Sequence, residues 1–145
     1  MSLYMETTRI SVDKTAGELC MLLARSGATK IQQDYDGGVV CAMHFILRVG
    51  QNDLPYRLPV RVQAVYDLLA SGRRVRNRAD LMEQAKRVAW RQILRWVQAQ
   101  LALIQTGMVQ AAEVFLPYMS VAPKQTFYEK VMLHGANLLT WKPQE

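Results

Sequence analysis

Apolar residues recur along the chain at two different spacings, which together predict an α+β fold. A spacing of two residues is typical of strands, and a spacing of three to four residues is typical of helices. In the first half, these spacings predict strands at 6–12, 29–35, 39–49 and 54–60 and helices at 14–26 and 61–71. Asp36-Gly37-Gly38 is a strong signal for a hairpin between the second and third of these strands. Asp13 is expected to cap the first helix.

The second half of the chain has helical spacing. Asn77 caps a long predicted helix at 78–106, and shorter helices are expected at 108–118 and 125–139. The predicted architecture is a small antiparallel sheet in the order β-α-β-β-β-α, followed by a helical C-terminal half with one long helix. We expect residues 1–145 to form a single domain, with a division into an α+β part at 5–72 and a helical part at 73–145 as the alternative.

The predicted strand at 39–49 has one wholly apolar face, and this face should lie in the core. Its even positions include His44 and Arg48, whereas its odd positions are all apolar. The odd positions are Val39, Cys41, Met43, Phe45 and Leu47. Because Cys20 and Cys41 stand outside any C-x-x-C motif, we expect two buried core thiols rather than a metal or redox site.

The composition is that of a globular protein. Half of the 145 residues are apolar and 21% are charged. No apolar run approaches the roughly 20 residues that a transmembrane helix needs. The first residues lack the basic and then apolar build of a signal peptide. We therefore expect a cytoplasmic protein with no membrane partner.

Residue types that carry catalysis or bind metals do not gather into a motif. His44 and His134 have no carboxylate or cysteine at ligand spacing, and no H-E-x-x-H or G-x-S-x-G sequence occurs. Asp34 and Asp36 lack a third ligand, and turn chemistry accounts for Asp36. We expect no catalytic residue, no metal site and no cofactor, so the protein is predicted not to be an enzyme.

Positive charge is concentrated in one segment. The net charge of the chain is +6. Residues 73–95 hold eight basic and two acidic residues, so this segment by itself carries a net charge of +6. The rest of the chain holds ten basic and ten acidic residues. A concentrated basic segment attracts phosphate backbones or acidic protein surfaces.

The candidate binding residues of this segment lie in a loop and on the long helix. Four arginines stand in the loop and at the helix start, and three more recur every four residues along one ridge of the helix. They are Arg73, Arg74, Arg76 and Arg78, followed by Arg87, Arg91 and Arg95. Like charges at this spacing repel, so a phosphate backbone, an acidic partner or acidic residues elsewhere in the fold should offset them. Trp90 lies near the ridge and is a candidate to stack on a base, whereas Trp96 continues the apolar core stripe.

Several stretches carry a resemblance to a known family. The stretch EQAKRVAWRQILRWVQAQLALIQTGM, with AEVFLPYM, TFYEKV, GATKIQQDY and PYRLPVR, resembles short, uncharacterised proteins encoded by bacteriophages, prophages and other mobile elements. The match would cover most of residues 7–133. The resemblance implies a role in phage DNA metabolism or in countering host defences, and it brings no catalytic residues with it.

Two functions from different classes remain open. The first is a non-enzymatic protein that binds nucleic acid through its arginine loop and helix, in phage DNA metabolism or recombination. The second is a protein–protein interaction module or inhibitor that binds an acidic partner surface. Self-association into a homo-oligomer is compatible with both, because the long helix is apolar around much of its girth after Val88.

Overall fold

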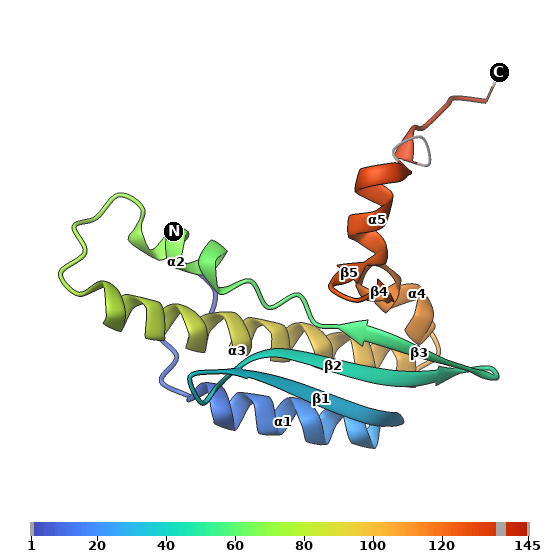
Figure 1. Cartoon of the computed structure of the whole chain (residues 1–145), viewed down its shortest axis with the longest axis horizontal. Helices are drawn as coiled ribbons and strands as arrows, with labels where there is room; N and C mark the ends of the chain where they lie inside the picture. Colours follow the sequence, from blue (N-terminus) through green and yellow to red (C-terminus); the bar gives the residue numbers. More distant parts are fainter. Residues whose placement is uncertain (1, 136–138, 145) are drawn as a thin grey trace.

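The computed structural model describes residues 2–135 and 139–144, which have an α+β fold with a small antiparallel sheet and one long helix (Figure 1). This confirms the predicted fold class. In chain order the elements are α1 (Val12–Arg25), β1 (Ala28–Asp36), β2 (Val39–Val49), β3 (Asn52–Arg57), α2 (Val62–Ala70), α3 (Arg78–Gln105), α4 (Ala111–Phe115), the 3₁₀ turn η1 (Leu116–Tyr118), β4 (Ser120–Ala122), β5 (Gln125–Thr126) and α5 (Phe127–His134).

The sheet has β2 at its centre, between β1 and β3, and all three strands are antiparallel. The expected hairpin forms between β1 and β2, and Gly37 and Gly38 both have positive φ in its turn. The register then shifts: Asp34 lies opposite Ala42, but Tyr35 lies opposite Val40. Residue 41 is therefore left over as a β-bulge.

This bulge corrects the expected core face of β2. Beyond the bulge the odd positions face the core, and Met43, Phe45 and Leu47 are buried as predicted. Before the bulge the alternation is reversed, so Val40 is buried and Cys41 is exposed. The prediction that Cys41 is a core thiol is wrong, because one extra residue in a strand moves the following side chains to the other face.

The two cysteines should differ in reactivity toward a thiol reagent such as Ellman's reagent. Cys41 is exposed, whereas Cys20 is partly buried and its Sγ accepts a hydrogen bond from Gln33 Nε2 at 2.9 Å. We expect Cys41 to react in a fast phase and Cys20 in a slower one, since access governs the rate. Cys41→Ser should remove the fast phase. The absence of a fast phase in the wild-type protein would contradict the bulged register, which places Cys41 at the surface.

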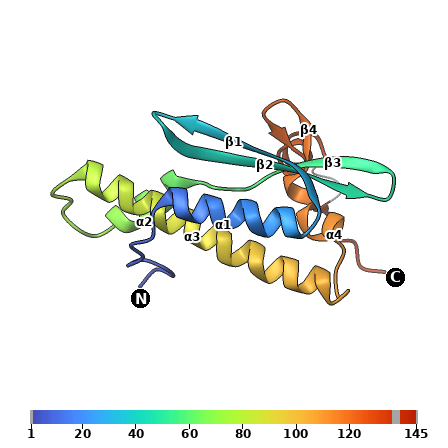
Figure 2. The ribbon, with the colours of Figure 1, turned by 90° about the horizontal axis from the view of Figure 1, so that it is seen from below.

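α1 and α3 run side by side along one face of the sheet (Figure 2). Their apolar stripes and the inward residues of the strands make one core, which extends to Phe115 of α4. Its buried members are Val12, Ala16, Leu19, Leu23, Val40, Met43, Phe45, Leu47, Tyr56, Leu58, Trp90, Leu94, Val97, Leu101 and Phe115. The opposite face of the sheet has neither of these helices on it.

The segment before α1 was expected to be a strand at 6–12, and this prediction is wrong. Residues 4–7 form a turn and residues 8–11 belong to no helix or strand. The Gln84 side chain of α3 donates to the backbone carbonyls of Glu6 and Thr8 at 2.8 and 2.9 Å, so a helix side chain takes the place of a neighbouring strand. α1 begins two residues earlier than expected, because Ser11 rather than Asp13 is its N-cap.

α3 begins and ends as predicted. The Asn77 side chain accepts a hydrogen bond from the backbone N–H of Asp80 at 3.1 Å, and Gly107 follows the last turn with a φ of 81°. Charged residues recur along its 28 residues. Across the described residues, no helix combines the length and apolarity that crossing a bilayer requires.

The C-terminal part is less helical than predicted. The helix expected at 108–118 shortens to α4 and η1, and a small hairpin of β4 and β5 precedes α5. The helix expected at 125–139 is described only to His134, and residues 136–138 lie outside the described residues. α5 projects away from the sheet, at the opposite end of α3 from the loop between α2 and α3 (Figure 1).

Candidate functional site

The loop between α2 and α3 carries three of the seven predicted arginines. Gly72 allows the chain to turn away from the end of α2. Its φ is 71°, a backbone angle that residues other than glycine rarely adopt. Asn77 then starts α3 and closes the loop. Between these two residues Arg73, Arg74 and Arg76 are all exposed. The loop therefore holds three solvated guanidinium groups beside the N-terminus of a long helix.

These arginines line an open hollow of about 840 Å³, which we call the arginine hollow. Its walls come from four segments: the chain before α1, the end of α2, the loop and the first turns of α3. The lining residues are Glu6, Thr7, Arg9, Leu69, Arg73, Arg74, Val75, Arg76, Asn77, Asp80, Leu81, Glu83, Gln84 and Arg87. Five arginines stand against three carboxylates, so the lining has a surplus of two positive charges.

Arg9 belongs to this hollow, and the sequence analysis missed it. It stands alone in the sequence, far from the basic segment, and nothing near it indicates a binding role. The hydrogen bonds from Gln84 to the carbonyls of Glu6 and Thr8 attach this segment to α3 and so bring Arg9 to the hollow. The same glutamine positions Arg87, because its Oε1 accepts from Arg87 Nε and Nη2 at 2.9 and 2.6 Å.

The five arginines of the hollow keep their charges free of carboxylate partners. Within residues 2–135 and 139–144, none of them has a carboxylate oxygen within 4.0 Å. Glu83 instead pairs with Lys86 at 2.9 Å. A cluster of unpaired guanidinium groups favours an anionic ligand, because guanidinium donates to phosphate or carboxylate in a paired geometry.

Two further predicted arginines are exposed but do not line the hollow. Arg78 is the first residue of α3 and borders the loop. Arg95 lies eight residues beyond Arg87 on α3, which is roughly 12 Å along the helix axis, and its Nη1 donates to Gln98 Oε1 at 2.9 Å. The predicted arginines therefore divide between the hollow, its border and a separate part of α3.

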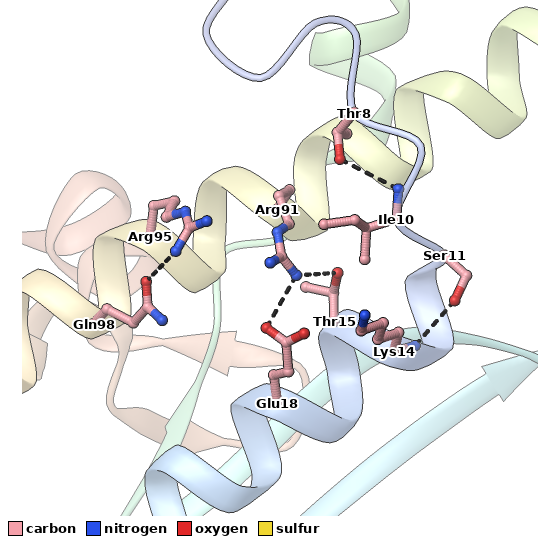
Figure 3. A network of polar contacts seen from close by, with 9 residues as sticks. All are labelled: Thr8, Ile10, Ser11, Lys14, Thr15, Glu18, Arg91, Arg95 and Gln98. Carbon is pink, nitrogen blue, oxygen red and sulfur yellow. Dashed lines mark hydrogen bonds and ion pairs between the residues drawn. The ribbon is translucent and has the colours of Figure 1, made fainter.

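Arg91 does not belong to a binding surface, which corrects the prediction of a continuous arginine ridge. It is only 6% exposed, because α1 packs against α3 at this point. Its Nη1 donates to Glu18 at 3.1 Å and to the Thr15 hydroxyl at 3.2 Å, both on α1 (Figure 3). The charge of Arg91 is thus offset inside the fold, which was one of the three alternatives left open for the ridge.

Trp90 is also buried, so the prediction that it stacks on a base is wrong. It is 1% exposed and belongs to the core. Trp96 is partly buried, and its ring meets Phe115 and Tyr118 edge-on at centroid distances of 5.7 and 5.4 Å. Both tryptophans therefore stabilise the fold by packing.

The described residues hold no group of three or more histidines, cysteines, aspartates or glutamates that could bind a metal ion. Comparison of the chain with family models, with curated proteins and with solved structures gives no match in any of the three. The interpretation of the hollow therefore rests on its own geometry and charge.

Proposed function

We propose that the protein binds nucleic acid by its phosphate backbone at the arginine hollow. The observation that carries this proposal is the convergence of Arg9, Arg87 and three loop arginines on one open hollow. Arginine charges neutralise phosphates and release condensed counterions, which supplies most of the affinity of sequence-independent binding. Arg78 borders the hollow and extends the same surface along the loop.

The hollow supports binding rather than chemistry. Guanidinium groups stay protonated at every physiological pH, so they position and neutralise a ligand but do not serve as general bases. We propose that these arginines bind and neutralise a ligand, and that the protein is non-enzymatic. The phage or mobile-element context that the sequence resemblance implies would place this binding in phage DNA metabolism or recombination.

The salt dependence of binding tests this proposal quantitatively. If Arg9, Arg73, Arg74, Arg76, Arg78 and Arg87 each neutralise one phosphate, the slope of log K against log salt should be roughly −5.4 for duplex DNA and −4.2 for a single strand. Replacing Arg73, Arg74 and Arg76 together by glutamine should reduce the magnitude of these slopes by roughly 2.7 and 2.1. Fluorescence anisotropy with labelled oligonucleotides at several salt concentrations measures both.

A control variant that loses the same charge elsewhere distinguishes an effect of the hollow from an effect of the protein's net charge. Lys14, Arg25 and Lys130 are exposed and lie outside the hollow, so replacing all three by glutamine removes the same charge from other surfaces. This variant should keep most of the wild-type slope. Absence of binding at low salt, or equal losses in the two triple variants, would contradict the proposal.

An acidic protein partner is the alternative for the same arginines, because carboxylates would also complement them. In that case the triple variant of Arg73, Arg74 and Arg76 should bind nucleic acid no more weakly than the control triple variant does. A partner recovered from a lysate should then depend on Arg73, Arg74 and Arg76.

A further inference from the structure

A second group of charged side chains lies on the face of the sheet that α1 and α3 leave uncovered. The register places His44 of β2 opposite Gln32 of β1 and opposite Arg57 of β3. The neighbours of these residues on the strands, such as Phe45 and Tyr56, are about 1% exposed and face the core. Because side chains alternate along strands, Gln32, His44 and Arg57 form one row on the opposite face.

Asp34 completes this row by contacting His44 diagonally across the two strands. Its Oδ2 lies 2.9 Å from His44 Nε2, and its Oδ1 accepts a hydrogen bond from Gln32 Nε2 at 2.8 Å. The hydrogen bonds from Gln32 and His44, with the nearby charge of Arg57, hold the pKa of the Asp34 carboxyl below its usual range. The sequence analysis found no carboxylate for His44, because the two residues stand ten positions apart and only the hairpin register joins them.

The β4–β5 hairpin forms the other wall of this site. Tyr56 of β3 pairs with Met119, which places the hairpin beside β3. A hollow of about 280 Å³ lies between the two, and we call it the hairpin hollow. It is lined by Asp34, His44, Arg57, Ser120, Lys124, Gln125 and Thr126. This volume is roughly nine times the ~30 Å³ that one water molecule occupies in the liquid, which is enough for a small hydrated ion.

Lys124 reaches this hollow from the turn of the hairpin. Its φ of 63° lies in the left-handed region, which favours glycine. The chain nevertheless has a lysine there, and the fold presents it to the hollow beside Arg57. Across the described residues, Arg57 and Lys124 have no carboxylate oxygen within 4.0 Å. Two cations from different elements therefore share one hollow without a partner.

The charges around His44 favour an anion in this hollow. Arg57 and Lys124 contribute two positive charges to the lining, and Asp34 contributes one negative charge that Gln32 and His44 already engage. A histidine ring has two nitrogens, and among the described residues only Nε2 of His44 has a hydrogen-bond partner. Further charged groups of this region are Lys30, Arg48 and Asp53 on the strands, and Glu129 of α5, which accepts a hydrogen bond from Thr126 and interacts electrostatically with Arg57.

We infer that the hairpin hollow is a binding site for a phosphate dianion, either free or at the end of a larger molecule. Arg57 and Lys124 supply the fixed charge. His44 lines the hollow beside them, and Asp34 holds its ring in place. This site is separate from the arginine hollow, because the hairpin lies at the other end of α3 (Figure 1).

The two histidines of the chain make a direct test available. His44 lines the hollow and His134 does not. In proton NMR spectra of the imidazole groups, the His134 signals therefore serve as an internal control. The variant His134→Gln assigns the two sets of signals. Inorganic phosphate added at neutral pH and constant ionic strength should shift the His44 signals progressively, because the bound anion lies beside this ring. The His134 signals should stay in place.

Variants distinguish this site from general electrostatic effects. Arg57→Gln or Lys124→Gln should weaken the His44 response by about tenfold in phosphate concentration, roughly the effect of losing one charge-assisted contact. Lys130→Gln removes one charge from the exposed surface of α5 outside the hollow and should respond like the wild type.

The source of the phosphate is decided by a second titration, with a dinucleotide that carries a 5′-terminal phosphate. A response to both ligands supports a site for free phosphate, and a response to the dinucleotide alone supports a site for a nucleic-acid end. Unmoved His44 signals with both ligands would overturn the inference. Equal responses of the Arg57, Lys124 and Lys130 variants would overturn it as well. The proposal for the arginine hollow stands or falls independently, since its variants lie in another part of the fold.

Discussion

Replacing Trp90 by alanine is expected to lower the free energy of unfolding by about 3–5 kcal/mol, the cost typical of removing a fully buried large aromatic side chain. Trp90 is among the largest of the fully buried side chains, and its environment is close-packed core. The loss combines the transfer free energy of the indole with the cavity that remains. For a chain of this size the melting temperature should fall by roughly 10–15 °C. Urea and thermal unfolding followed by circular dichroism measure both.

Trp141 provides the matched control for this prediction. Its side chain is 82% exposed, so Trp141→Ala should change the free energy of unfolding by less than about 0.5 kcal/mol. Trp90→Phe should keep the fold at a smaller cost and leave oligonucleotide affinity unchanged, since the ring does not reach the surface. A loss of affinity in folded Trp90→Phe would show that the indole contacts the ligand after all.

Glu18→Gln is expected to cost about 2–3 kcal/mol of stability, because it leaves the guanidinium of Arg91 buried with a neutral partner. The side chain of Arg91 is 7% exposed and that of Glu18 is 36% exposed. We place the effect below the 3–5 kcal/mol typical of a fully buried pair, since water reaches the carboxylate. Arg91→Met should cost less, because it leaves Glu18 partly hydrated and removes a guanidinium whose Nε is buried without a partner.

The double variant completes a cycle. Glu18→Gln combined with Arg91→Met should recover part of the stability lost in Glu18→Gln, since the unpaired charge is gone. Urea unfolding of the four proteins at neutral pH gives the coupling free energy. Additive losses would indicate that the pair does not interact. Arg91→Met should also leave nucleic-acid affinity unchanged, which separates Arg91 from the arginines of the hollow.

The sequence predicted helices and turns correctly where residues close together in the chain determine them. Asn77 caps α3 by a hydrogen bond within four residues, and the Gly37–Gly38 turn joins β1 to β2. The hairpin of β4 and β5 was missed, because its strands are only three and two residues long and carry too little pattern. The β-bulge at Cys41 was missed too, since an added residue in a strand changes which side chains face inward without changing the composition.

The candidate site was predicted in part, and the failures have one cause. The loop arginines were found because a charged loop is solvated wherever it lies. The helix ridge was misjudged, because the packing of α1 against α3 decides which of its arginines meets solvent. Arg87 lines the hollow, Arg91 is buried against Glu18, and Arg95 is exposed elsewhere. Arg9 could not be found, since only the Gln84 hydrogen bonds bring it to the loop.

The sequence by itself determined the α+β class, the long capped helix, the hairpin and the concentration of charge at 73–95, because periodicity, caps and charge are properties of neighbouring residues. Only the tertiary structure decided the roles of Trp90, Arg91 and Arg9 and the pairing of Asp34 with His44. These roles depend on contacts between residues that are far apart in the chain. Such contacts decide whether a side chain is buried and paired inside the fold or exposed to solvent.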